Sequence, residues 1–246
     1  MEQELIWIRE KYPTESDYQA ALDRYRTGEP LAYILGEQYF WRYCFTVTPD
    51  VLIPRPDTER LVETALSLLP QGGRFADLCT GSGAIALSIC GDRTDLTCDA
   101  ADISEAALEV AKGNARVIGT GDRVRFHRAD LLVEDPLCGL YDAILSNPPY
   151  IPAKDIANYP SLAYEPQIAL DGGEDGMDFY KAIIARFGSH LADDGCFLFE
   201  IGYDQGDAIR ALADANGYVC TVTKDYGGND RVAKLIKPIN RKEVTQ

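Results

Sequence analysis

The tetrapeptide Asn147–Tyr150, Asn-Pro-Pro-Tyr, places an amide, two prolines and an aromatic ring directly after an apolar run that is typical of a buried strand. Two successive prolines remove two backbone donors and fix two φ angles, so neither a helix nor a sheet ladder continues through them. The prolines therefore predict a rigid loop. The Asn147 amide and the Tyr150 ring would let such a loop hold something planar, although a rigid turn without chemistry uses the same residues.

A second candidate, the segment Cys79–Gly83, joins a predicted strand to a predicted helix. Glycines there let the backbone approach a ligand closely, and the helix start offers unpaired N–H groups. Asp102 closes the next predicted strand, 19 positions after Gly83, where a carboxylate can accept hydrogen bonds from both ribose hydroxyls. The alternatives are a tight turn and a capping aspartate. The predicted cofactor-binding residues of this pair are Cys79, Thr80, Gly81, Ser82, Gly83 and Asp102.

The glycine spacing bears on which nucleotide would bind. A dinucleotide dehydrogenase usually carries a third glycine, whereas Ala84 and Ala86 follow Gly83 here. A mononucleoside ligand such as S-adenosylmethionine needs no pyrophosphate cradle. Asp130, at the end of the third predicted strand, could accept from an adenine amino group, with Leu131 against the ring. A strand-end turn and a core leucine would look the same.

The elements that position these residues alternate along the chain. Short apolar runs alternate with helical patterns from residue 75 onward, which predicts an α/β fold with a parallel, doubly wound sheet. Only residues 225–230 separate the last two runs, so these should form an antiparallel hairpin at the sheet edge. The predicted strands lie within 74–79, 96–102, 124–130, 141–146, 196–202, 218–224 and 231–237, and the helices within 83–91, 104–119 and 176–195.

The N-terminal part of the chain, before residue 70, shows a different pattern of predicted elements. Residues 14–30 predict one helix that stops at Gly28 and Pro30, and residues 38–49 show the aromatic and β-branched alternation of a hairpin. A further helix is predicted within 53–69, with Pro56 near its start. The chain divides on this basis into a short helix and hairpin segment, 1–50, and a main domain, 51–246. We expect the front segment to pack on the main domain because it is too short for a core of its own.

Composition excludes several function classes. The formal charge of −15 argues against tight, non-specific binding to nucleic acid. Seven cysteines without a C-x-x-C pair fit neither a disulfide framework nor a zinc site, so no metal is predicted. The sequence has two histidines and neither a G-x-S-x-G nor an H-E-x-x-H motif, so it lacks the catalytic and metal-binding residues that a hydrolase or metalloprotease would need. No apolar run is long enough to span a bilayer and no signal peptide opens the chain, which predicts a cytoplasmic protein.

Six segments in order resemble the release-factor glutamine N5-methyltransferase family, known as HemK or PrmC. The similarity runs from Gly28 to Val232 and is far more specific than the N-P-P-Y motif, which adenine-N6 and guanine-N2 methyltransferases share. It implies the class I, Rossmann-like methyltransferase fold, with a mostly parallel seven-stranded sheet and an antiparallel edge hairpin. The segments are GEPLAYILGEQYFWRYCFTV, VLIPRPDTERLVETAL, DLCTGSGAIALSI, LSNPPYIP, EPQIALDGGEDGMDFY and DDGCFLFEIG.

The resemblance also implies a reaction, methyl transfer from S-adenosylmethionine to a glutamine side-chain nitrogen in the Gly-Gly-Gln motif of class I release factors. An amide nitrogen is a poor nucleophile and must be positioned. By the resemblance, Asn147 accepts one of its N–H bonds, the Pro148 carbonyl accepts the other, Pro149 holds the loop and Tyr150 packs on the amide. No base is needed before transfer. Residues 1–50 would contribute to substrate recognition, with no nucleic acid or membrane as a partner.

The sequence departs from the family pattern in two places. Cys79 stands where the family usually has the first glycine of its loop, and only about one helix is predicted before Gly28, where relatives usually carry several. Three alternatives stay open at this point: a nucleic-acid methyltransferase acting on an exocyclic amine, a ribosomal-protein glutamine methyltransferase, and a nucleoside-binding module without catalysis.

Overall fold

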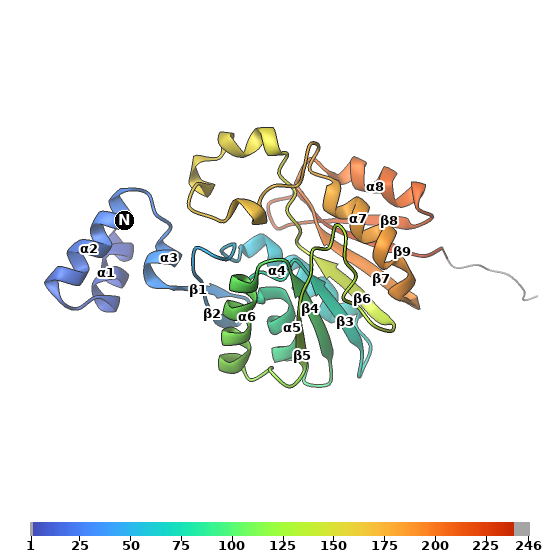
Figure 1. Ribbon diagram of the computed structural model, residues 1–246, viewed down its shortest axis with the longest axis horizontal. Helices are drawn as coiled ribbons and strands as arrows, with labels where there is room; N and C mark the ends of the chain where they lie inside the picture. The colour runs from blue at the N-terminus through green and yellow to red at the C-terminus, as the bar shows by residue number, and fades with distance from the viewer. Residues whose placement is uncertain (1, 239–246) are drawn as a thin grey trace, which may run out of the picture.

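A seven-stranded sheet forms the centre of the protein, seen here in a computed structural model that describes residues 2–238 (Figure 1). Its order is β5-β4-β3-β6-β7-β9-β8, and the first five of these strands run parallel. This confirms the predicted α/β methyltransferase-type fold. The strands are β3 (Arg74–Leu78), β4 (Thr97–Asp102), β5 (Val124–Arg128), β6 (Tyr141–Ser146), β7 (Leu191–Glu200), β8 (Val219–Lys224) and β9 (Asp230–Ile236).

The antiparallel hairpin lies at the edge of the sheet, as predicted. Strand β9 pairs with both β7 and β8, so the last strand among residues 2–238 lies inside the sheet and β8 forms its border. The connecting turn is closed by a hydrogen bond from the Asp225 N–H to the Asn229 carbonyl, 2.8 Å long, and Gly228 takes a φ of +87° within it.

Helices cover both faces of the sheet. Alternate residues of one strand point to opposite faces, and in β7 Cys196 and Leu198 pack on the side of α5 and α6 while Phe197 and Phe199 pack on the side of α7 and α8. Both faces are therefore buried, as a parallel sheet requires. The helices are α4 (Glu59–Leu68), α5 (Ala84–Asp92), α6 (Glu105–Ile118), α7 (Asp178–Phe187) and α8 (Gly206–Ala215), with a 3-10 turn, η1 (Pro56–Thr58), before α4.

Two helix predictions are corrected. The helix expected within 176–195 ends at Phe187, because Gly188–His190 form the 3-10 turn η5 and Leu191 then pairs with Tyr141 as the start of β7. Helix α8 is absent from the sequence-based prediction, although Ile209 and Ala213, four residues apart on one face, are both fully buried.

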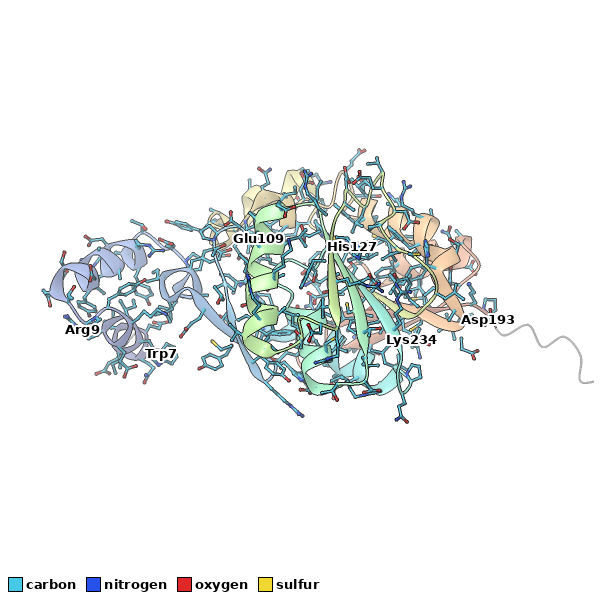
Figure 2. All side chains as sticks on the ribbon, turned by 60° about the horizontal axis from the view of Figure 1, so that its bottom comes forward. Trp7, Arg9, Glu109, His127, Asp193 and Lys234 are labelled. Atoms are coloured by element: carbon cyan, nitrogen blue, oxygen red, sulfur yellow. The ribbon has the colours of Figure 1, made fainter. Side chains whose placement is uncertain are left out.

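The N-terminal region contains more structure than expected. Two helices, α1 (Glu2–Lys11) and α2 (Glu15–Arg26), precede Gly28, followed by the short helix α3 (Leu31–Leu35) and the hairpin β1 (Glu37–Phe40) and β2 (Tyr43–Thr46). The three helices share a small core of their own around Ile8, Ala21 and Ile34. Helices α1 and α2 stand at one end of the molecule, and Trp7 and Arg9 lie there, far from Asp193 and Lys234 (Figures 1 and 2). Helix α3, in contrast, packs on the main domain in a buried cluster that includes Ala107 of α6.

The segment between β6 and α7 forms a loop with three 3-10 turns, η2 (Ala153–Asn158), η3 (Pro160–Leu162) and η4 (Gln167–Ala169). It folds back on itself where Ile151 bridges Asp171. The part of the loop between η3 and η4 contacts the N-terminal region, where the Tyr164 hydroxyl donates to the Thr27 carbonyl over 2.8 Å. None of the helices described for residues 2–238 has the length and apolarity required to span a bilayer.

Candidate active site

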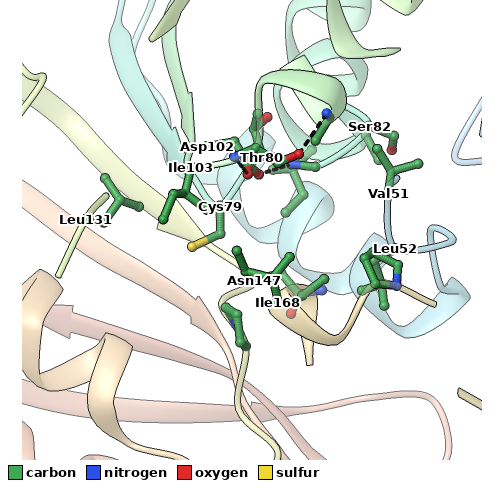
Figure 3. Close-up of a pocket in the computed structure, with 18 of the residues that line it drawn as sticks. Val51, Leu52, Cys79, Thr80, Ser82, Asp102, Ile103, Leu131, Asn147 and Ile168 are labelled. Atoms are coloured by element: carbon green, nitrogen blue, oxygen red, sulfur yellow. Dashed lines mark hydrogen bonds between the residues drawn. The ribbon is translucent and has the colours of Figure 1, made fainter. Parts of the chain in front are cut away.

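Both motifs found in the sequence lie at one edge of the sheet. Strands β3, β4, β5 and β6 are parallel, so their carboxyl ends meet there, the usual ligand site of open α/β sheets. A pocket of about 220 Å³ opens between these strand ends, the segment 50–58 and η4 (Figure 3). The predicted residues that line it are Cys79, Thr80, Gly81, Ser82, Asp102, Asp130, Leu131, Asn147 and Pro149.

The loop after β3 reverses the chain through residues of positive φ. Gly81 and Gly83 have φ values of +55° and +82°, and Cys79 has +60°, which a side chain rarely adopts. The loop therefore keeps its left-handed turn despite the cysteine. Gly83 does not line the pocket: it precedes α5, and a Cβ there would approach the Leu87 side chain to 2.7 Å. Its role here is chain reversal and close packing.

Asp77, on β3, holds this loop by hydrogen bonds and is not among the predicted site residues. Its Oδ2 accepts from the Thr80 hydroxyl over 2.6 Å and from the Ala86 N–H over 3.2 Å, and the residue is fully buried. Burial raises the pKa of Asp77 to about 7. Asp77 thus ties the loop to the first turn of α5.

Asp102 connects the loop to the end of β4. Its Oδ2 accepts from the Gly81 N–H over 2.8 Å, and its Oδ1 accepts from the Ser104 N–H over 2.9 Å. Burial raises its pKa, against the effect of these backbone bonds. A carboxylate has about four lone-pair positions and the Ile103 N–H is a further backbone donor to Asp102, so Asp102 can hold the loop and still accept from a ligand hydroxyl group.

Asp130 and Leu131 follow β5 by two and three residues. Asp130 Oδ1 accepts from the Leu132 N–H over 3.0 Å, an Asx-type turn that fixes the strand exit. Leu131 is buried yet borders the pocket. Together they provide an acceptor and an apolar surface on one wall, the combination that a nucleobase requires.

The Asn-Pro-Pro-Tyr loop separates two pockets. Asn147 lines both the pocket described above and a smaller one beside it; Pro149 borders the first, while Pro148 and Tyr150 border the second. The Asn147 Nδ2 donates to the Thr58 hydroxyl oxygen over 3.3 Å. This bond directs the amide nitrogen toward Thr58.

Two contacts fix the chain where it leaves this loop. Gln205 Nε2 donates to the carbonyl oxygens of Tyr150 and Gly176, 3.1 Å from each. A Cβ on Gly172 would lie 2.7 Å from the Tyr150 Cα, so the chain approaches too closely there for any side chain. The glycines of the segment 172–176 therefore allow close packing behind Tyr150.

Several residues of the site were missed by sequence reasoning. Arg55 forms an ion pair with Glu165, and Glu165 Oε2 also accepts from the Ile53 N–H over 3.0 Å. Arg55 lines both pockets, and Glu200, a carboxylate that ends the apolar strand β7, lines the second. The signal for Glu200 is the one that identified Asp102, an acid closing a buried strand. The other missed residues that line the first pocket include Leu52, Thr58, Ile103, Ile168 and Phe179.

Comparison with known proteins also indicates a methyltransferase. Residues 57–159 match the Methyltransferase small domain family. The structure resembles a methyltransferase from Pyrococcus furiosus with a TM-score of 0.62 and 18% identity, over 91% of this chain and 100% of that one, which supports the fold.

Sequence relatives are more specific. The chain is 44% identical to the release factor glutamine methyltransferase of Coxiella burnetii, over 87% of this chain and 77% of that protein. It is 45% identical to that of Moorella thermoacetica, over 86% of this chain and 76% of that protein. Such identity over most of both chains, together with a methyltransferase-type fold, shows that the chain belongs to the release factor glutamine methyltransferase family.

Proposed function

We propose that this protein transfers a methyl group from S-adenosylmethionine to the glutamine side-chain nitrogen in the Gly-Gly-Gln motif of class I peptide chain release factors. The observation that carries the proposal is the position of Asn147, which borders both pockets. A nucleoside in the first pocket and a planar amide in the second would meet at this residue.

The residues of the first pocket fit S-adenosylmethionine. Asp102 lines the pocket and would accept from the ribose hydroxyls, Asp130 and Leu131 would hold the adenine, and Cys79–Ser82 would contact the remainder of the molecule. The loop has no pyrophosphate-type third glycine, which suits a mononucleoside. When bound, S-adenosylmethionine supplies a methyl group on a positively charged sulfur.

The second pocket would position the acceptor. Because the Asn147 nitrogen is occupied by Thr58, its oxygen is free to accept one N–H of the glutamine amide. The Pro148 carbonyl would accept the other N–H, and Tyr150 would pack on the flat amide. Two acceptors fix both protons, direct the nitrogen lone pair and stabilise the positive charge that develops on nitrogen.

We infer that three surfaces hold the release factor: the helix around residues 15–27, the aromatic stretch Tyr39–Phe45, and the segment Ile151–Asp178. The Tyr164–Thr27 hydrogen bond joins the first and the last of these. The slim, glycine-flanked glutamine loop of a release factor would enter between them. Tyr39, which is 76% exposed, offers an uncovered aromatic ring on this surface.

The test is methyl transfer from labelled S-adenosylmethionine to three candidate acceptors: a class I release factor, total ribosomal protein and total nucleic acid. The proposal predicts that label enters the release factor, and that a release factor with the Gly-Gly-Gln glutamine replaced by alanine stays unlabelled. Label in ribosomal protein or nucleic acid alone would favour one of the alternative methyltransferases.

A further inference from the structure

Glu200 is a buried carboxylate beside the acceptor pocket that the proposed reaction does not yet use. It closes β7, is 2% exposed and lines the second pocket together with Asn147, Pro148 and Tyr150. Its Oε2 has no hydrogen-bond partner among residues 2–238. A buried, incompletely paired carboxylate is costly, so its position needs an explanation.

Thr58 connects this carboxylate to Asn147. The Thr58 side chain hydrogen-bonds with Glu200 and favours its charged form, and the same hydroxyl oxygen accepts from Asn147 Nδ2 over 3.3 Å. Thr58 is itself buried. The three side chains, from β7, η1 and the loop after β6, therefore form one hydrogen-bonded line that ends at the acceptor pocket.

The chemistry of each group determines which side chain donates and which accepts in these two hydrogen bonds. An ionised carboxylate can only accept, so Thr58 must use its single proton toward Glu200. The hydroxyl can then only accept from Asn147, which therefore turns its nitrogen toward Thr58 and its oxygen toward the substrate. If Glu200 became protonated, the Thr58 proton would be free to turn to Asn147 and the opposite amide orientation would be equally well bonded.

We propose that ionised Glu200, acting through Thr58, orients the Asn147 amide so that its oxygen faces the glutamine nitrogen of the substrate. Glu200 is in this sense a positioning residue. The inference rests on the proposed function, because only an acceptor that donates N–H bonds requires an oxygen at this point. A reversed Asn147 would present N–H groups to the substrate N–H groups.

The surroundings of Glu200 make its charge sensitive to pH. Burial raises the pKa of Glu200 to about 7, partly opposed by Thr58 and by the positive charge of Arg231, while Asp57 adds to the increase and Arg55 opposes it. Both arginines are engaged elsewhere: Arg231 pairs with Asp225 at 3.1 Å and with Asp57 at 3.3 Å, and Arg55 pairs with Glu165.

Two tyrosines complete the set of titratable groups that face Glu200. Burial raises the pKa of the Tyr150 hydroxyl, and the nearby negative charge of Glu200 adds to this effect. Tyr180 donates to the Glu200 backbone carbonyl over 2.8 Å, and burial raises its pKa in the same way. Neither phenol titrates near neutrality. Burial also raises the pKa of Asp77, which holds the ligand loop, to about 7, so the loss of the pH 7 transition in Glu200→Gln is the result that assigns it to Glu200.

The first experiment is the pH dependence of kcat for release-factor methylation by four proteins: wild type, Glu200→Gln, Thr58→Val and Thr58→Ser. Wild-type kcat should rise as pH increases through about 7 and then level off. Glu200→Gln and Thr58→Val should lose this rise and be slower at the plateau by roughly ten-fold, the rate equivalent of one hydrogen bond. Thr58→Ser, which keeps the hydroxyl, should restore both rate and pH dependence.

The second readout does not depend on turnover. Calorimetry should show that Glu200→Gln, which does not line the first pocket, binds S-adenosylhomocysteine with wild-type affinity. Glu200→Gln and Thr58→Val should both bind the release factor more weakly, and the double variant should lose no more affinity for it than either single one. Glu109→Gln serves as a charge-change control, since Glu109 is exposed on α6 beside Lys112 and lines neither pocket.

The outcomes separate the two proposals. If the wild-type protein does not methylate a release factor, the proposed function fails. If it does, but Thr58→Val and Glu200→Gln keep the wild-type pH profile and release-factor affinity, the orientation of Asn147 does not depend on Glu200 and the inference is wrong. Loss of melting temperature in proportion to activity in both variants would likewise contradict it, because a purely structural role predicts that result.

Discussion

Asn114 of α6 donates its Nδ2 to the Ser82 carbonyl over 3.0 Å, and this bond joins α6 to the ligand loop. The same side chain accepts from the Thr46 N–H over 2.8 Å and donates to the Thr46 carbonyl over 3.0 Å. Asn114 is 1% exposed. A single buried amide therefore holds β2, α6 and the loop after β3 in one arrangement.

Asn114→Ala should accordingly lower both stability and ligand affinity. It leaves the Ser82 carbonyl, on a buried residue, and the Thr46 backbone groups without their partner, which costs about 1–3 kcal/mol of unfolding free energy. Urea denaturation measures this, with Asn216→Ala as a control, because Asn216 is exposed and donates only to the Leu212 carbonyl at the end of α8. Equal losses of unfolding free energy in both variants would show that the Asn114 hydrogen bonds contribute no more to stability than those of an exposed asparagine.

Asp102→Ala tests the ligand assignment. The variant removes the proposed ribose contacts, worth about 1.5–3 kcal/mol for charge-assisted bonds, and also frees the Gly81 N–H that holds the loop. We expect titration calorimetry to show at least that loss in affinity for S-adenosylmethionine. Unchanged affinity, or a preference for a nicotinamide dinucleotide, would refute this position of the nucleoside.

Asn147→Ala tests whether the motif serves chemistry or folding. One side-chain bond, to Thr58, is lost, so melting temperature and cofactor affinity should stay near wild type. Methyl transfer should fall by about two orders of magnitude or more, the scale for removing an oriented polar group from a transition state. Comparable losses of stability and activity would instead support a structural turn.

His190 gives stability a pH dependence that is independent of the active site. Burial lowers its pKa, but hydrogen bonds with the Gly139 carbonyl, 2.8 Å from Nδ1, and with Asp135, 2.9 Å from Nε2, outweigh this and raise it overall. A raised pKa means that the charged histidine stabilises the folded state. This contribution is complete below the unfolded pKa of about 6.5 and disappears as pH rises through the folded pKa.

His190→Gln should therefore be less stable than wild type at pH 5, by on the order of 1 kcal/mol after solvent screening. The difference should shrink as the pH is raised past neutrality. Denaturation midpoints at several pH values measure it, with Asp135→Asn expected to produce the same pattern. A difference that stays constant with pH would show that packing, and not charge, is responsible.

The sequence was sufficient for the local features of this fold. Apolar runs identified every strand of the main sheet, and the helix predicted within 104–119 is confirmed as α6, whose first turn is capped by the Ser104 side chain accepting from the Ala107 N–H. Parallel strand ends also brought Asp102, Asp130 and Asn147 to one pocket. These predictions succeed because hydrophobic period and strand direction are local properties.

Features that depend on distant contacts were not predictable in this way. Helix α1 buries only Ile8 and depends on α2 and α3 for its packing, so its own period is weak. Arg55 and Glu165 meet across 110 residues of sequence. The contact between Thr58 and Asn147 spans 89 residues. No local pattern encodes such pairs, so sequence reasoning identified Asn147 but missed Thr58, Arg55 and Glu165.

The most direct test of the central claim is the position of the added methyl group. Intact class I release factor is incubated with this protein and S-adenosylmethionine, digested, and sequenced by tandem mass spectrometry, with the Asn147→Ala protein in parallel. We predict one methyl group on the side-chain nitrogen of the Gly-Gly-Gln glutamine, and little or none with the variant. A methyl group on any other residue, or equal modification by both proteins, would contradict the account.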